Sequence, residues 1–66
     1  MNAKITGDDI REWRIRKALT QAMAARRLGL SKATLMDWER GRRTPGITRG
    51  VGPEQFRRVV RTIFHT

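Results

Sequence analysis

Apolar residues in the last quarter of the chain follow the spacing of one helical face. Between positions 53 and 64, apolar residues stand at i, i+3, i+4, i+7 and i+8: Phe56, Val59, Val60, Ile63 and Phe64. This spacing is typical of an amphipathic helix. Pro53 suits the first helical position, where the backbone N–H has no helical partner. We expect a helix over residues 53–64 whose apolar stripe covers a core formed by the other helices.

The opposite face of this helix leaves a second interpretation open. Arg57, Arg58 and Arg61 make that face basic, and basic amphipathic helices also lie on membranes or bind partner proteins. We favour the role in the core, because the other helices would otherwise leave their apolar faces exposed.

The middle of the chain predicts two shorter helices joined by a tight turn. The first covers residues 21–28 and begins after Thr20, whose hydroxyl can accept from backbone N–H groups that a helix start leaves unpaired. It ends at Gly29, because glycine adopts the left-handed conformation of a helix end at little cost. Ser31 can cap the second helix, over residues 32–40.

The second of these helices has one apolar and one mixed face. Leu35 and Trp38 recur at helical spacing and are expected to point inward. The positions left outward are Lys32, Ala33, Met36, Asp37 and Arg40.

A further helix is predicted near the start of the chain. Thr6 and Asp9 have the spacing of a capping box, so the helix begins near Gly7 or Asp8 and continues to about Ala18. The residues expected inward are Ile10, Trp13 and the stem of Lys17, and those expected outward are Arg11, Glu12, Ile15 and Arg16.

Residues spread over most of the chain resemble a known family at fixed spacing. They are Leu19-Thr20-Gln21, Ala25, Leu28-Gly29-Leu30-Ser31, Thr34-Leu35, Trp38-Glu39-Arg40-Gly41 and Pro45, with Ile10, Trp13 and Arg14 upstream. This run is similar to the helix-turn-helix of Cro and CI repressors. The sequence departs from the family's usual pattern at Ala24, where leucine is usual, and at Trp13, which is often leucine. We expect the larger Trp13 to fill the space that Ala24 leaves.

The resemblance implies an all-α fold, a compact four-helix domain like that of lambda repressor. Residues 1–66 then form a single domain with the helix-turn-helix at 20–40, a loop at 42–52 and the last helix at 53–64. Residues 1–5, with Lys4, are expected to form a flexible arm, which either frays or reaches a minor groove. Ile47 and Val51 in the loop are candidates for either the core or a contact between subunits.

The same resemblance implies which residues meet DNA. In the major groove, Lys32 can donate to guanine, Ala33 and Met36 can contact a thymine methyl, and Asp37 can accept from cytosine or exclude wrong sites. The candidate phosphate contacts are Gln21, Ser31, Thr34, Arg40, Arg42 and Arg43. The family also implies an ion pair between Arg14 and Glu39 that ties the first helix to the recognition helix.

Composition narrows the possible functions further. The chain has 66 residues, no cysteine, one histidine and a formal charge of +9, which favours a polyanionic partner over a disulfide or zinc site. His65 has no nucleophile or carboxylate pair placed to work with it, so we expect neither an enzyme nor a cofactor. No apolar run approaches the about 20 residues of a membrane span, and the start lacks the apolar region of a signal peptide. We therefore expect a cytoplasmic protein with no membrane contact.

We expect a sequence-specific regulator of transcription that binds double-stranded DNA, a phage or bacterial repressor acting as a homodimer on a palindromic operator. No small-molecule effector is expected in so small a core. The alternative is an antitoxin-like or anti-activator protein-interaction module with secondary DNA binding, for which an exposed apolar patch from Ile15, Ile47, Val51 or Met36 would speak. RNA binding is disfavoured because the few aromatic residues are expected in the core.

Overall fold

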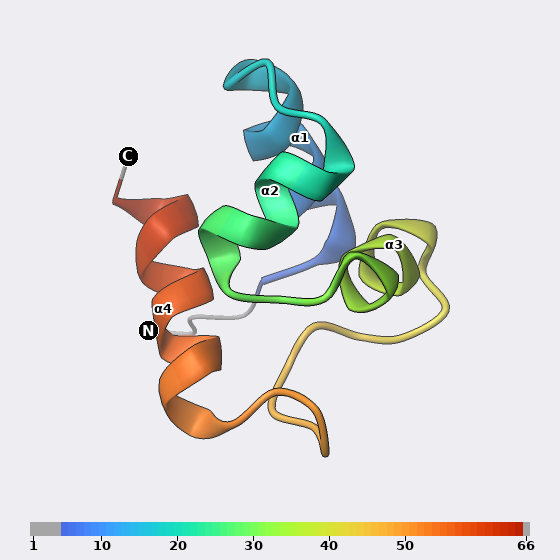
Figure 1. Cartoon of the computed structure of the whole chain (residues 1–66), viewed down its shortest axis with the longest axis vertical. Coiled ribbons are helices and arrows are strands. Elements are labelled where there is room, and N and C mark those ends of the chain that lie inside the picture. The colour runs from blue at the N-terminus through green and yellow to red at the C-terminus, as the bar shows by residue number, and fades with distance from the viewer. Residues whose placement is uncertain (1–4, 66) are drawn as a thin grey trace.

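The computed structural model describes residues 5–65 and contains four helices (Figure 1). They are α1 (Gly7–Arg16), α2 (Gln21–Leu28), α3 (Lys32–Arg40) and α4 (Pro53–Phe64). In Figure 1, α2 lies in the middle of the molecule, with α3 and α4 on opposite sides of it. Apart from an isolated bridge between Thr48 and Val51, this part of the chain forms no β-structure. The predicted all-α fold of four helices is confirmed.

Three helices begin at the capping residues that the sequence predicts. Thr6 and Asp9 form a capping box, with Asp9 N donating to Thr6 Oγ1 at 3.1 Å and Thr6 N donating to Asp9 Oδ2 at 3.0 Å. The hydroxyls of Thr20 and Ser31 each accept from the backbone N–H three residues later, at 3.1 Å. Gly29 ends α2 in the predicted left-handed conformation, with φ 72°. These local contacts explain why the helix starts can be read from sequence.

All four helices contribute to one apolar core. Its buried members are Ile5, Ile10, Trp13, Leu19, Ala24, Ala25, Leu28, Leu30, Leu35, Trp38, Val51, Val59 and Ile63. Phe56 of α4 packs edge-on against Trp38 of α3, with ring centroids 6.2 Å apart, a favoured aromatic geometry. The indole N–H groups of Trp13 and Trp38 are buried without an acceptor among residues 5–65, so both rings act through packing.

The first helix is shorter than predicted, ending at Arg16 instead of about Ala18. Ala18 adopts a left-handed conformation with φ 57°, and Leu19 N donates to Arg14 O at 3.0 Å. This turn reverses the chain and places Leu19 in the core. As a result Lys17 is exposed, and the prediction that its stem is buried was wrong.

Ile5 departs from the predicted flexible arm, because its side chain is only 2% exposed and belongs to the core. The capping turn at Thr6 brings the preceding residue against the helices, as a hydrophobic residue before a cap often packs inward. The rest of the predicted arm, residues 1–4 with Lys4, lies outside the described residues.

The last apolar positions are divided between core and surface. Phe64, predicted on the buried stripe of α4, is 51% exposed and is the last residue of that helix. Val51 is buried in the core, whereas Ile47 is exposed. The loop therefore contributes one of its two candidate residues to the core.

Candidate nucleic-acid interface

Helix α3 presents a mixed outer face. Leu35 and Trp38 are buried and fix the helix on the core. Lys32 and Ala33 in its first turn are exposed, and Met36 and Asp37 one turn later are partly exposed. The four residues predicted to meet base edges are therefore open to solvent on one short helix, but to different degrees.

The last turn of α3 is held to α1 by an ion pair. Arg14 Nε donates to Glu39 Oε2 at 2.8 Å and Arg14 Nη2 donates to Glu39 Oε1 at 3.0 Å, a two-point geometry that favours arginine over lysine. The side chains are 17% and 5% exposed, respectively. Hydrogen bonding to Glu39 raises the pKa of Arg14 above its ordinary value, while burial acts in the opposite direction. Arg14 Nη1 also donates to Leu19 O at 3.3 Å, so one guanidinium links α1, the chain before α2, and α3.

Gln21, at the start of α2, joins this ion pair. Its side-chain amide donates to Glu39 Oε1 at 3.4 Å, and the residue is half-buried. A phosphate contact from Gln21 would therefore come from a side chain whose position depends on Glu39. The first turn of α2 is in this way fixed relative to the end of the recognition helix.

The start of α3 is ordered by its own hydroxyl groups. Ser31 Oγ accepts from Thr34 N and donates to Thr34 Oγ1 at 2.8 Å. Both residues stand at the end of α3 that the base-contact prediction places in the groove. Their first role in the structure is to cap the helix, and a phosphate contact from either hydroxyl is compatible with that role.

Asp37 has contacts that the sequence did not suggest. Its carbonyl oxygen accepts from Arg42 N at 2.9 Å and from Arg43 N at 3.3 Å, and its carboxylate lies 3.8 Å from Arg43 Nε. The left-handed Gly41, with φ 80°, turns the chain so that these contacts form. A glycine just after a helix signals the turn, but no local pattern identifies the side-chain pair.

Arginines surround the exposed end of α3. Three exposed arginines are close together in sequence here: Arg40, Arg42 and Arg43. Arg40 is the last residue of α3, and the other two belong to the turn that follows. Together with Lys32 at the other end of the helix, these arginines make α3 and the turn after it net positive, which suits a polyanion.

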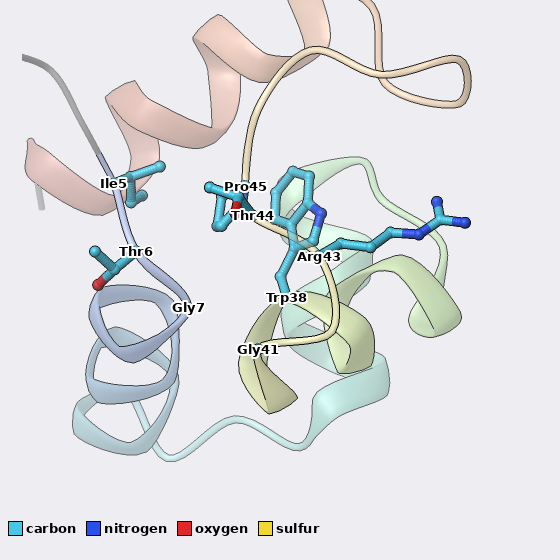
Figure 2. A pocket seen from close by; sticks show the side chains of 8 residues that line it. All are labelled: Ile5, Thr6, Gly7, Trp38, Gly41, Arg43, Thr44 and Pro45. Atoms are coloured by element: carbon cyan, nitrogen blue, oxygen red, sulfur yellow. The ribbon is translucent and has the colours of Figure 1, made fainter.

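A surface hollow of about 230 Å³ lies beside the start of α1 and the end of α3 (Figure 2). It is lined by Ile5, Thr6, Gly7, Trp38, Gly41, Arg43, Thr44 and Pro45. Figure 2 shows the Arg43 side chain extending away from Ile5 and Thr6. The lining consists largely of apolar side chains and backbone, so the hollow has few groups that could bind a polar ligand. The charge of Arg43 faces solvent and belongs to the outer surface.

A family model described as helix-turn-helix matches residues 10–49, which include α2, α3 and most of α1. The chain belongs to the Cro/CI-type helix-turn-helix family. This family binds DNA and is not an enzyme family, and its helix-turn-helix makes the chain a DNA-binding regulator. No curated protein and no solved structure gives a significant match. Within residues 5–65, no helix is both long and apolar enough to cross a bilayer.

Proposed function

We propose that this Cro/CI-type chain is a transcriptional repressor that reads double-stranded DNA with α3 in the major groove. The observation that carries the proposal is the division of α3 into a buried face, with Leu35 and Trp38, and an outer face of hydrogen-bonding and methyl-bearing groups. On this outer face, Lys32 donates to guanine, Ala33 and Met36 contact a thymine methyl, and Asp37 accepts from cytosine N4.

Phosphate contacts supply most of the affinity in this proposal. The groups assigned to them are Gln21, Ser31, Thr34, Arg40, Arg42 and Arg43. If about five phosphates are neutralised per subunit, the logarithm of the affinity falls with the logarithm of the salt concentration at a slope near −4.5. Such contacts set the register of α3 on the duplex and leave sequence discrimination to its outer face.

A homodimer on a palindromic operator completes the proposal. One α3 of nine residues covers only a few base pairs, and two copies about 34 Å apart read two half-sites one turn of DNA apart. Doubling the contacts in this way supports the discrimination that a repressor needs.

The alternative function, an antitoxin-like or anti-activator module, needs an exposed apolar patch. Val51 lies in the core, and the exposed Ile15 and Ile47 belong to the last turn of α1, at the top of Figure 1, and to the loop before α4, in its lower half. Apolar residues scattered in this way are ordinary for a soluble surface. This distribution favours DNA over a protein as the main partner.

The test is fluorescence anisotropy with duplexes selected from a random pool and with scrambled versions of them. The variant Lys32→Ala with Asp37→Ala removes two base-contact groups at no net change in charge. Its matched control is Glu12→Ala with Arg16→Ala, which removes one charge of each sign from exposed positions on α1.

We expect the wild type and the control to prefer selected duplexes by about a thousandfold or more. The Lys32/Asp37 variant loses most of this preference and still binds every duplex with strong salt dependence. Equal and weak binding of the wild type to all duplexes would refute the proposal.

A further inference from the structure

The turn between α2 and α3 is held by a helix outside the helix-turn-helix. The side-chain amide of Gln55, on α4, donates to the carbonyl oxygen of Gly29 in that turn. A Cβ built on Gly29 would lie 3.5 Å from Arg58 Nη1 and 3.9 Å from Gln55 Nε2. In Figure 1 the middle of α4 accordingly lies beside this turn. The guanidinium of Arg58 therefore borders the segment that leads directly into the recognition helix.

Arg58 differs from the arginines that have partners within the fold. Arg14 is bound to Glu39, and Arg43 lies near Asp37. Arg58 is exposed, and among residues 5–65 no carboxylate lies within 4.0 Å of its guanidinium. Its charge and its hydrogen-bond donors are thus available to an anion that approaches the turn.

The geometry of the major groove brings a phosphate strand to such a position. The groove is about 12 Å wide, and a helix with its side chains is about 10–12 Å across. When α3 lies in the groove, the flanking phosphates consequently run close to its sides and to its N-terminal end. Arg58 lies next to Gly29, two residues before the cap residue Ser31, and its long side chain can reach one of these strands.

We propose that Arg58 is a further phosphate contact, through which α4 extends the DNA-binding surface beyond the helix-turn-helix. The proposal rests on the proposed function, since it assumes that α3 enters the major groove. Gln55 acts as a positioning residue, because its hydrogen bond to Gly29 sets the distance between α4 and the turn.

The same helix offers matched controls. Arg57 and Arg61 are exposed arginines on α4, and neither is among the three atoms nearest to a Cβ on Gly29. Changing each of the three arginines to glutamine removes the same charge from the same helix. Any difference between the variants then reports position and not net charge.

The experiment is anisotropy of wild type, Arg58→Gln, Arg57→Gln, Arg61→Gln and Arg58→Lys on one selected and one scrambled duplex, over a range of salt concentrations. We expect Arg58→Gln to reduce the magnitude of the salt slope by about 0.9 and to weaken binding about fivefold near 0.15 M salt, on both duplexes alike. Arg57→Gln and Arg61→Gln stay within about twofold of wild type, and Arg58→Lys retains the wild-type slope.

The salt slope separates a phosphate contact from a structural role. Partial unfolding of Arg58→Gln would weaken binding at every salt concentration and leave the slope unchanged, and a circular-dichroism melt measures the folded fraction directly. Provided that the wild type prefers the selected duplex, either of two results overturns the assignment of Arg58. One is a wild-type salt slope for Arg58→Gln, and the other is an equal loss of affinity in all three glutamine variants. If the wild type does not prefer the selected duplex, the proposed function fails and this contact fails with it.

Discussion

Gly7, the first residue of α1, lies directly against the backbone carbonyl of Trp38 in the last turn of α3. A Cβ on Gly7 would overlap Trp38 O and would lie 2.9 Å from the Trp38 carbonyl carbon and 3.4 Å from Glu39 Cα. The two helices thus meet backbone to backbone at one point, and Arg14 and Glu39 join them at a second. The end of the recognition helix is fixed to α1 by both contacts.

We predict that Gly7→Ala destabilises the domain by about 2 kcal/mol, because the new methyl group must displace the backbone of α3. For a domain of this size, that corresponds to a fall in the melting temperature of about 10 °C. Thermal melts followed by circular dichroism measure the effect. Gly50→Ala is the control, since Gly50 has no atom within 4 Å of its added Cβ and no left-handed φ. Helix propensity alone favours alanine over glycine in a helix. A melting temperature of Gly7→Ala above that of the wild type would therefore contradict the close approach.

Removing one partner of the ion pair is predicted to cost more than removing both. Arg14→Ala leaves the largely buried Glu39 carboxylate without its partner, at a cost of about 3–5 kcal/mol. The double variant Arg14→Met with Glu39→Met leaves no unpaired charge, so its melting temperature should exceed that of either single methionine variant. The two single methionine variants and the double variant form a double-mutant cycle. If their losses in the free energy of unfolding simply add, the two side chains do not interact.

The raised pKa of Arg14 fixes the direction of its pH dependence. A group whose pKa rises on folding contributes stability that is fully present below its unfolded pKa and is lost only above it. Because arginine titrates far above neutral pH, the Arg14 contribution should stay constant from about pH 6 to about pH 9. Melts of wild type and Arg14→Ala across this range should differ by the same amount, and a difference that shrinks with rising pH would refute this expectation.

Asp37→Asn is predicted to strengthen nonspecific binding and to weaken sequence preference. The carboxylate repels every phosphate strand that approaches α3, so its removal raises the affinity for scrambled duplexes. It also replaces the charged acceptor for cytosine N4 by a neutral amide oxygen, which accepts a weaker hydrogen bond, so discrimination at one base pair falls by up to about 1–3 kcal/mol. Anisotropy on single-base variants of a selected duplex measures both effects. The control is Glu12→Gln, which removes one negative charge from an exposed position on α1. If the two variants change affinity and sequence preference equally, Asp37 has no role in recognition.

Trp13 and Ala24 are predicted to be coupled through core volume. Both are buried, and the family pattern has leucine more often at each position. Ala24→Leu alone overpacks the core and costs about 1–3 kcal/mol. Adding Trp13→Leu removes volume and should recover part of that loss, which a double-mutant cycle of unfolding free energies measures. Strictly additive losses would mean that the two side chains fill separate spaces.

Much of the fold follows from short-range patterns. The caps at Thr6, Thr20 and Ser31 and the turn at Gly29 depend on hydrogen bonds between residues at most a few positions apart. Such contacts are encoded in a window of sequence, and so the starts of three helices agree with their prediction. The family, and with it DNA binding, was likewise predictable, because its motif is a set of residues at fixed spacing.

Other features depend on how the helices pack. Ile5 is buried and Phe64 exposed because the outline of the core, and not the apolar character of the residue, decides which positions it covers. Gln55 contacts Gly29 across 26 positions, and Arg58 lies beside the same glycine. Sequence alone therefore determined where the helices begin, most of their charged and apolar faces and the DNA-binding motif. Only the tertiary structure decided which basic groups lie next to the recognition helix, because that depends on where α4 crosses the turn.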